Sequence, residues 1–334
     1  MHYAVGILLT AIIAYVSTHI SALLPYHLVS ASVLSLLFGM LLHPYVAKKK
    51  IFEKGVRFAS KQLLRLSIVL MGLTLSFSQV LLVGSYSLFV MMFTLFTAFA
   101  GGFLLGKLLG LDWKLSSLIS AGTGICGGSA IAAIAPTIDA KHNHVAYAIS
   151  ATFLFDVLMV LLFPLMGRYF SMTDMGYGLW TGTAVNDTSS VVAAGYAFSD
   201  SAGSYSVIVK LTRTLAIIPT VLIFSFINAR VESKNSKSSS ERKRVALKQI
   251  FPFFIILFLV MIAVKSLHIV SDEMSTQIAS YSKFCMVMAL GAIGLKTNFK
   301  EVCSAGFKPM FHGFIISATV VVVSFFVQLL LGQV

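Results

Sequence analysis

Long apolar stretches, separated by short polar connections, run along almost the entire chain. A helix of about 20 apolar residues is long enough to cross the hydrocarbon core of a bilayer. A window of that length finds apolar stretches near residues 4–24, 28–46, 63–80, 85–108, 115–136, 144–166, 176–198, 206–228, 250–268, 279–296 and 307–331. The pattern predicts an all-α membrane protein with about eleven transmembrane helices, built as a single domain over residues 1–334.

Composition supports the same class of protein. Of the 334 residues, 57% are hydrophobic and only 11% are charged, a balance that a soluble domain could not bury. The first apolar stretch has no basic segment before it and no clear small-residue cleavage site after it. We therefore expect a retained first span and a multi-pass protein of the inner or plasma membrane.

Basic residues concentrate in two polar connections, which sets the expected orientation. The connections after the second and the eighth span together hold 14 of the 25 basic residues: Lys48, Lys49, Lys50, Lys54, Arg57, Lys61, Arg65, Arg230, Lys234, Lys237, Arg242, Lys243, Arg244 and Lys248. Six spans separate the two connections, so both lie on one side, which the positive-inside rule assigns to the cytoplasm. The amino terminus is then cytoplasmic, and the carboxyl terminus and the acidic loop 271–277 lie outside.

The excess of 13 positive charges does not indicate a nucleic-acid partner, because the charges sit beside membrane spans. Residues 230–248 are rich in Ser and Lys and predict a flexible cytoplasmic linker between helices that contacts anionic lipid. The three cysteines have no metal-ligand spacing, and no catalytic or nucleotide-binding motif occurs in a credible context. We therefore expect no metal, no cofactor and no enzymatic activity.

The stretch GTGICGGSAIAAIAP, residues 122–136, carries four glycines and a proline inside an apolar span. Glycine and proline weaken helices by about 1 and 3 kcal/mol relative to alanine. A helix that stops within the bilayer must bury its freed backbone groups, and its N–H groups form a ready anion site. The candidate substrate-binding residues are Thr123, Gly124, Cys126, Gly127, Gly128 and Ser129. The alternative is a close helix–helix contact made by small residues.

A second span, GLWTGTAVNDTSSVVAAGYA (178–197), carries polar residues at its centre. Asp187 would cost about 3 kcal/mol in mid-membrane, so we expect it to face water or protein. With Asn186 and Thr188 it is the candidate site for a coupling ion, either H⁺ or Na⁺. The alternative is an extramembrane loop that joins two shorter helices. Asp156, midway along the sixth span, is a lesser candidate for the same reason.

Lys210 and Arg213 stand three residues apart, on one face of the eighth span. Two cations on one apolar helix suit an anion, and arginine can bind two oxygens at once. They complete the candidate substrate-binding set. The alternative is that the two side chains reach out to the membrane surface.

Interrupted helices and intramembrane charges together are typical of secondary transporters built from inverted repeats. A weak internal sequence similarity supports a repeat. Residues 72–84 and 294–306 share five identities: Gly72/Gly294, Leu73/Leu295, Phe77/Phe299, Val80/Val302 and Gly84/Gly306. The two interrupted spans do not occupy equivalent positions in a simple five-plus-five repeat.

These motifs resemble the YeiH-like family of bacterial membrane proteins, often called sulfate exporters. The resemblance rests on residues 63–84, GICGGSA (124–130), VVAAG (191–195) and the Lys210–Arg213 pair. It implies a transporter of sulfate or sulfonate-like anions with a fold distantly similar to sodium/proton antiporters and bile-acid symporters. Some members carry His-Glu in place of Asn186-Asp187, and some carry a basic residue in place of Thr74.

The leading hypothesis is an ion-coupled secondary transporter of a small anion, bound by the broken helices, Lys210 and Arg213, with Asp187 as the coupling group. The runner-up is a cation/proton antiporter in which Asn186 and Asp187 carry the ion and the two cations are structural. A membrane scaffold or an intramembrane enzyme is a third alternative. The expected partners are the anion, the coupling H⁺ or Na⁺, and lipid, and a homodimer is one possible assembly.

The orientation is open to a direct test. Single cysteines introduced at positions 234–240 should react with a membrane-impermeant thiol reagent only after cells are permeabilised. Cysteines at 272–276 should react in intact cells, because that loop is predicted to lie outside. The reverse labelling pattern would show that the orientation is wrong.

Overall fold

The computed structural model describes residues 2–23, 31–235, 253–297 and 306–333, and every regular element within these ranges is helical. The main helices are α1 (His2–Leu23), α2 (Ala31–Val46), α3 (Lys50–Phe58), α4 (Leu64–Met71), α5 (Phe77–Phe96), α6 (Gly102–Leu109), α7 (Trp113–Ala121), α8 (Gly128–Ile134), α9 (His142–Tyr169), α10 (Asp174–Ala184), α11 (Thr188–Phe198), α12 (Asp200–Thr214), α13 (Ile217–Asn235), α15 (Phe254–Ser266), α16 (Asp272–Lys296) and α18 (Phe307–Leu330). Four short segments join some of them: the π-helical η2 (Ala59–Leu63), η4 (Thr97–Gly101) and η5 (Gly122–Cys126), and the 3-10 turn η3 (Gly72–Thr74).

The predicted all-α membrane architecture is confirmed, but the count of eleven spans is not. Six described helical runs are long and apolar enough to cross a membrane: Tyr3–Leu23, Phe77–Leu109, Asn143–Tyr169, Asp200–Val231, Glu273–Lys296 and Phe307–Leu330. Helices α2 and α15 are apolar but shorter. The other three predicted spans are interrupted, and none of their described pieces combines the length and the apolar character of a membrane span.

One predicted span, 63–80, has a break that the hydropathy pattern did not reveal. The helix ends at Thr74, and α5 begins at Phe77 after a capping box. In that box the Ser76 hydroxyl accepts from the Gln79 N–H, and the Gln79 side chain accepts from the Ser76 N–H. The two reciprocal bonds satisfy backbone donors at the start of α5 and so stabilise a helix that begins here.

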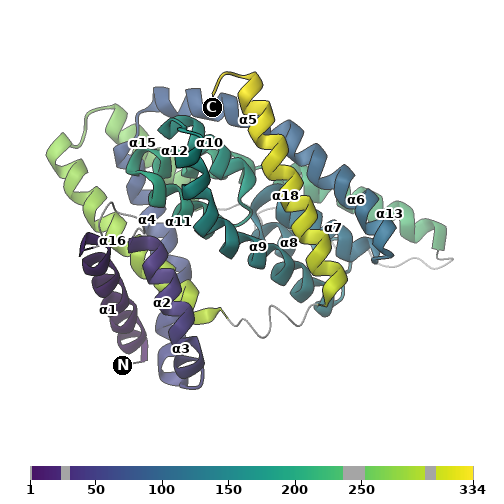
Figure 1. Cartoon of the computed structure of the whole chain (residues 1–334), viewed down its shortest axis with the longest axis horizontal. Coiled ribbons are helices and arrows are strands. Elements are labelled where there is room, and N and C mark those ends of the chain that lie inside the picture. Colours follow the sequence, from purple (N-terminus) through teal and green to yellow (C-terminus); the bar gives the residue numbers. More distant parts are fainter. Residues whose placement is uncertain (1, 24–30, 236–252, 298–305, 334) are drawn as a thin grey trace.

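The helices form two groups that are visible in Figure 1. Helices α1, α2, α3, α4, α15 and α16 pack together, and the N-terminus lies beside α3. The second group contains α5 to α13 and α18, with α12 packed on α5, α10 and α11, and α18 packed on α9 and α10. Residues 230–235 of the predicted linker continue α13, and residues 236–248 lie outside the described ranges.

Backbone contact through glycine joins α2 to α16 in the first group. A Cβ added to Gly39 would lie 2.2 Å from the carbonyl oxygen of Gly291 and 2.9 Å from the Cα of Gly294. In a membrane, helices associate largely through such close packing, because lipid is as apolar as the side chains themselves. The absence of a side chain at Gly39 therefore sets the separation of these helices.

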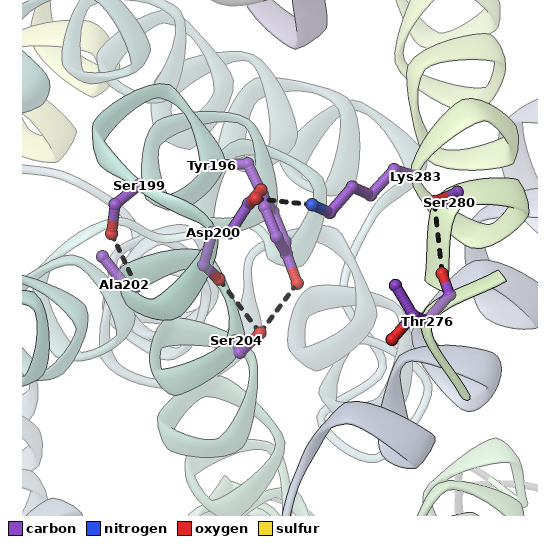
Figure 2. Close-up of polar contacts among 8 residues, drawn as sticks. All are labelled: Tyr196, Ser199, Asp200, Ala202, Ser204, Thr276, Ser280 and Lys283. Atoms are coloured by element: carbon purple, nitrogen blue, oxygen red, sulfur yellow. Dashed lines mark hydrogen bonds and ion pairs between the residues drawn. The ribbon is translucent and has the colours of Figure 1, made fainter. Parts of the chain in front are cut away.

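An ion pair connects the two groups at the start of α12. Figure 2 shows Lys283 of α16 reaching Asp200, with 2.5 Å between Nζ and Oδ2. Both side chains are largely exposed, at 41% and 70%, so the pair contributes at most about 1 kcal/mol. The first turn of α12 is held independently by Ser199, whose hydroxyl accepts from the Ala202 N–H. The two groups also share an apolar core, in which Leu36 and Ile68 of the first group lie with Val192 of the second, so the ion pair adds only an exposed polar contact.

The contact between α2 and α16 generates a stability prediction. Gly39→Ala should lower the unfolding free energy by about 1–3 kcal/mol, because the added methyl overlaps backbone atoms that cannot move independently. Gly84→Ala, also inside a helix, is the matched control, because a Cβ there meets no described atom within 4 Å. Thermal unfolding of both variants in detergent measures the difference. Equal melting temperatures would contradict the packing argument.

Candidate functional site at the crossing of two interrupted helices

The first interrupted helix breaks at Gly127. Helix α7 continues into η5, whose last residue is Cys126, and α8 begins at Gly128. Gly127 itself has φ +64° and ψ −130°, a conformation that side chains disfavour. A Cβ at Gly127 would also lie 3.1 Å from the Cα of Asp187. The predicted interruption is confirmed, and glycine is required there for both its conformation and its closeness to the second break.

The second interrupted helix breaks at residues 185–187. Helix α10 ends at Ala184, Val185 is extended, and Asp187 is the N-cap of α11. Residues 181–186 are all buried, so the break lies inside the second helix group and is not an exposed loop. The interrupted-helix interpretation is confirmed. The two breaks, at Gly127 and at residues 185–187, lie against each other, and we call this place the crossing.

Lys210 and Arg213 are both 0% exposed, which rules out the alternative that they reach the membrane surface. The Lys210 ammonium donates to the carbonyl oxygens of Ile125 and Val185, each at 2.9 Å. Both acceptors lie where the first half of an interrupted helix ends. Such C-terminal carbonyls lack intrahelical partners and carry partial negative charge, so a cation stabilises them.

Arg213 extends the same arrangement one turn along α12. Its Nε donates to the Gly124 carbonyl at 2.6 Å, and its Nη1 and Nη2 donate to the carbonyls of Thr183 and Thr123, both at 2.5 Å. One guanidinium therefore binds the chain ends of both interrupted helices. In this structure the two cations hold the breaks together, and their binding of an anion stays a prediction.

The opposite charges lie at the start of α11, the second half of the second interrupted helix. Asp156 of α9, also 0% exposed, accepts from the backbone N–H of Asn186 at 2.8 Å and of Asp187 at 2.9 Å. Asp187 accepts through Oδ2 from both the N–H and the hydroxyl of Ser189. Two carboxylates thus meet N–H groups, while two cations meet carbonyls, and the crossing is electrically complementary.

Two acceptor oxygens at the crossing are left over. Asn186 donates through Nδ2 to the Ser317 hydroxyl at 3.1 Å, while its buried Oδ1 has no partner within the described residues. The second oxygen of Asp187, Oδ1, has no hydrogen bond in the described ranges either, and it faces Gly127. Asp187 is only partly buried, Gly128 has open space beside it, and Ser129 is exposed. This side of the crossing is accessible and presents oxygen acceptors.

Helix α18 contributes polar residues that the sequence reasoning missed. The Ser317 hydroxyl also contacts that of Thr123 at 3.3 Å, and the Ser324 hydroxyl contacts that of Thr183 at 2.6 Å. Gln328 donates to Ser324 at 3.1 Å. Ser317, Ser324 and Gln328 are spaced by seven and four residues, which puts them on one face of an apolar helix. This spacing was the sequence signal that could have identified them.

The predicted site residues divide into three sets by location. Those brought together at the crossing are Thr123, Gly124, Gly127, Asn186, Asp187, Lys210 and Arg213. Gly128, Ser129 and Thr188 begin the second halves on the accessible side. Cys126 is buried in an apolar cluster with Ile125 and Ile131. Asp156, which the sequence ranked as a lesser candidate, lies at the centre.

Most of the chain matches a known family. The family model described as "Conserved hypothetical protein 698" matches residues 5–313. A "UPF0324 membrane protein" of Clostridium tetani is 63% identical over 99% of this chain and 98% of its own length. Relatives with the same name in Streptococcus pneumoniae and Fusobacterium nucleatum are 40% and 35% identical over 98% of this chain, and over 97% and 98% of their own lengths. The expected membership in a conserved membrane-protein family is confirmed, whereas the sulfate-exporter name is not.

A solved structure, the sodium proton antiporter MjNhaP1 from Methanocaldococcus jannaschii, aligns with 100% of this chain and 98% of its own length. The two sequences are 13% identical, and the TM-score is 0.29. A likeness this weak carries no conclusion about this chain.

The carbonyl contacts of the two cations generate a second stability prediction. Arg213→Met and Lys210→Met should each lower the melting temperature by roughly 10 °C, because carbonyls and carboxylates at the crossing lose buried cationic partners. Lys107→Met, at an exposed lysine, is the control and should change the melting temperature little. Unchanged unfolding of both buried-cation variants would contradict the structural role of the pair.

Proposed function

This chain belongs to the family described as conserved hypothetical protein 698, and we propose that it is an ion-coupled secondary transporter whose coupling cation binds at Asp187 and Asn186. One observation carries the proposal. At the crossing of two interrupted helices, the cationic donors are directed to backbone carbonyls, while two side-chain oxygens have no partner in the described part of the chain.

The chemistry of the unpaired groups favours a cation. A carboxylate and an amide carbonyl offer only acceptor oxygens to an ion, which suits Na⁺, and a carboxylate also suits H⁺. Lys210 and Arg213 have five bonds to carbonyl oxygens and no exposed surface, so an anion would have to displace those contacts to bind them. These facts favour the cation/proton exchange hypothesis, with a structural Lys–Arg pair, over the small-anion hypothesis.

The arrangement also suits reversible binding. Asp156 is fully buried and occupied by two backbone N–H groups, so its role is to orient residues 186 and 187. Asp187 stands between this fixed carboxylate and the accessible side, where Gly128 and Ser129 begin α8. An ion can therefore reach Asp187 without unfolding the crossing. Neutralising this carboxylate, by a proton or by Na⁺, would also reduce its repulsion with Asp156.

Transport of a small anion such as sulfate or a sulfonate is the second candidate function. The specific observation in its favour is the exposed Ser129, whose hydroxyl can donate to an anion and which lies next to the open space beside Gly128. In that version Asp187 remains the coupling group, and the anion binds at Gly128 and Ser129.

Asp187→Asn separates the coupling role from the capping role. Asparagine is as good an N-cap as aspartate, so α11 should keep its start and the protein its melting temperature. In proteoliposomes with an imposed pH or Na⁺ gradient, we expect at least about tenfold less gradient-driven flux of labelled sodium, because a charged coupling group is lost. Labelled sulfate in the same liposomes tests the anion hypothesis.

The control is Glu273→Gln, which makes the same chemical change at an exposed position on α16. It should leave flux unchanged. Full gradient-driven flux in Asp187→Asn would contradict the proposal. Sulfate movement that depends on the gradient would favour the anion substrate, and sodium movement without sulfate movement would favour cation exchange.

A further inference from the structure

A basic groove lies in the first helix group, away from the crossing. It is an open pocket of about 630 Å³, lined by α3, by the π-helical segment η2 that continues it, and by Tyr3 of α1. Four cations line it: Lys50, Lys54, Arg57 and Lys61. The groove lies at the end of the group that contains the N-terminus, which the positive-inside rule assigns to the cytoplasm.

Positive charge in the groove is only partly balanced. Its one acidic residue, Glu53, pairs with Arg57 at 2.8 Å. Lys50, Lys54 and Lys61 have no ion-pair partner within the described residues. Lys296, at the end of α16, is close enough to Lys61 and Arg57 to add its own repulsion.

The spacing of the cations makes this imbalance costly without a ligand. Lys50 and Lys54 stand four residues apart, as do Arg57 and Lys61, and like charges at this spacing destabilise a helix. The helix cannot turn away, because α1 and α3 touch through their backbones: a Cβ at Gly55 would lie 2.4 Å from the Tyr3 carbonyl oxygen. A bound anion would relieve the repulsion.

Apolar groups accompany the cations. The rings of Tyr3 and Phe58 meet edge to face, with centroids 6.4 Å apart, and they are 56% and 38% exposed. Ile51 lines the same groove and is 37% exposed. Free phosphate has no apolar group to contact this surface, whereas the acyl chains of a lipid can pack against it. Basic pockets between membrane helices on the cytoplasmic side bind anionic headgroups.

We propose that this groove is a binding site for an anionic phospholipid, whose phosphate contacts Lys54 and Lys61 and whose acyl chains lie along Tyr3, Ile51 and Phe58. The site is independent of the transport crossing, which lies in the other helix group. Its occupant would fix α3 and η2 against α1 at the membrane surface.

The test compares two variants with equal charge loss in the full-length protein. Lys54→Gln with Lys61→Gln removes two groove cations, and Lys107→Gln with Lys308→Gln removes two exposed lysines elsewhere. All four side chains are exposed, so both variants should keep the wild-type melting temperature. Binding of phosphatidylglycerol, of phosphatidylcholine and of soluble glycerol phosphate is measured in neutral detergent by native mass spectrometry.

We expect phosphatidylglycerol to bind the wild type and the control variant, and to bind the groove variant about 30-fold more weakly, from about 1 kcal/mol per cation near a lipid headgroup. Phosphatidylcholine should bind weakly to all three proteins, and glycerol phosphate should not compete. Equal affinity in the groove variant, or an equal loss in both variants, would overturn the site. Competition by glycerol phosphate as strong as by the lipid would show a soluble-phosphate site instead.

Discussion

A helix that stops inside a membrane protein leaves backbone N–H and C=O groups where water does not reach them, and the structure depends on satisfying those groups. The second helix group does so with side-chain charge. Lys210 and Arg213 bind the carbonyl ends of both interrupted helices, and Asp156 and Asp187 bind N–H groups at the start of α11, the second half of one of them. A bare buried ion costs several kcal/mol, but each hydrogen bond to a charged group contributes about 1.5–3 kcal/mol. Five such bonds to carbonyls explain why two cations persist in the interior.

That solution also determines what is available for function. Charges used to satisfy backbone groups are not free to bind a substrate, so the groups that matter are the ones left over. At the crossing these are acceptor oxygens of Asn186 and Asp187, which lie beside the glycines of the first break. The helix ends whose buried backbone groups lack intrahelical partners therefore also create an accessible acidic position. The sequence pattern of broken helices with intramembrane charge was a sound guide to the place, although two of its charges are used to hold the chain together.

The first helix group is held by different physics. Its contacts are backbone to backbone, through Gly39 with Gly291 and Gly294, and through Gly6 with Gly55. Such contacts use no buried charge, and four of its cations lie in the exposed groove around α3. The first group shares an apolar core with the second group, and the exposed ion pair of Asp200 with Lys283 adds a weak contact between α12 and α16. One group thus holds charge in its interior around a candidate ion site, and the other holds it in an exposed groove.

The class of fold follows from the amino-acid sequence alone, because apolar length and helix-breaking residues act locally. The breaks at Gly127 and at Asn186–Asp187 followed from glycine, proline and polar residues within apolar spans, and the structure has both. The break before Phe77 escaped notice, because a capping box at Ser76 and Gln79 is a weaker signal than a run of glycines. The partners of the buried charges, in contrast, depend on how distant helices pack against one another. From the sequence, we expected Lys210 and Arg213 to be free to bind an anion. Their carbonyl acceptors could not be foreseen, because these lie 85 to 90 and 25 to 30 positions away in the chain. Asp156 and Ser317 became part of the site only when α9 and α18 packed against the second break, since no local pattern encodes which distant helix faces an interrupted one.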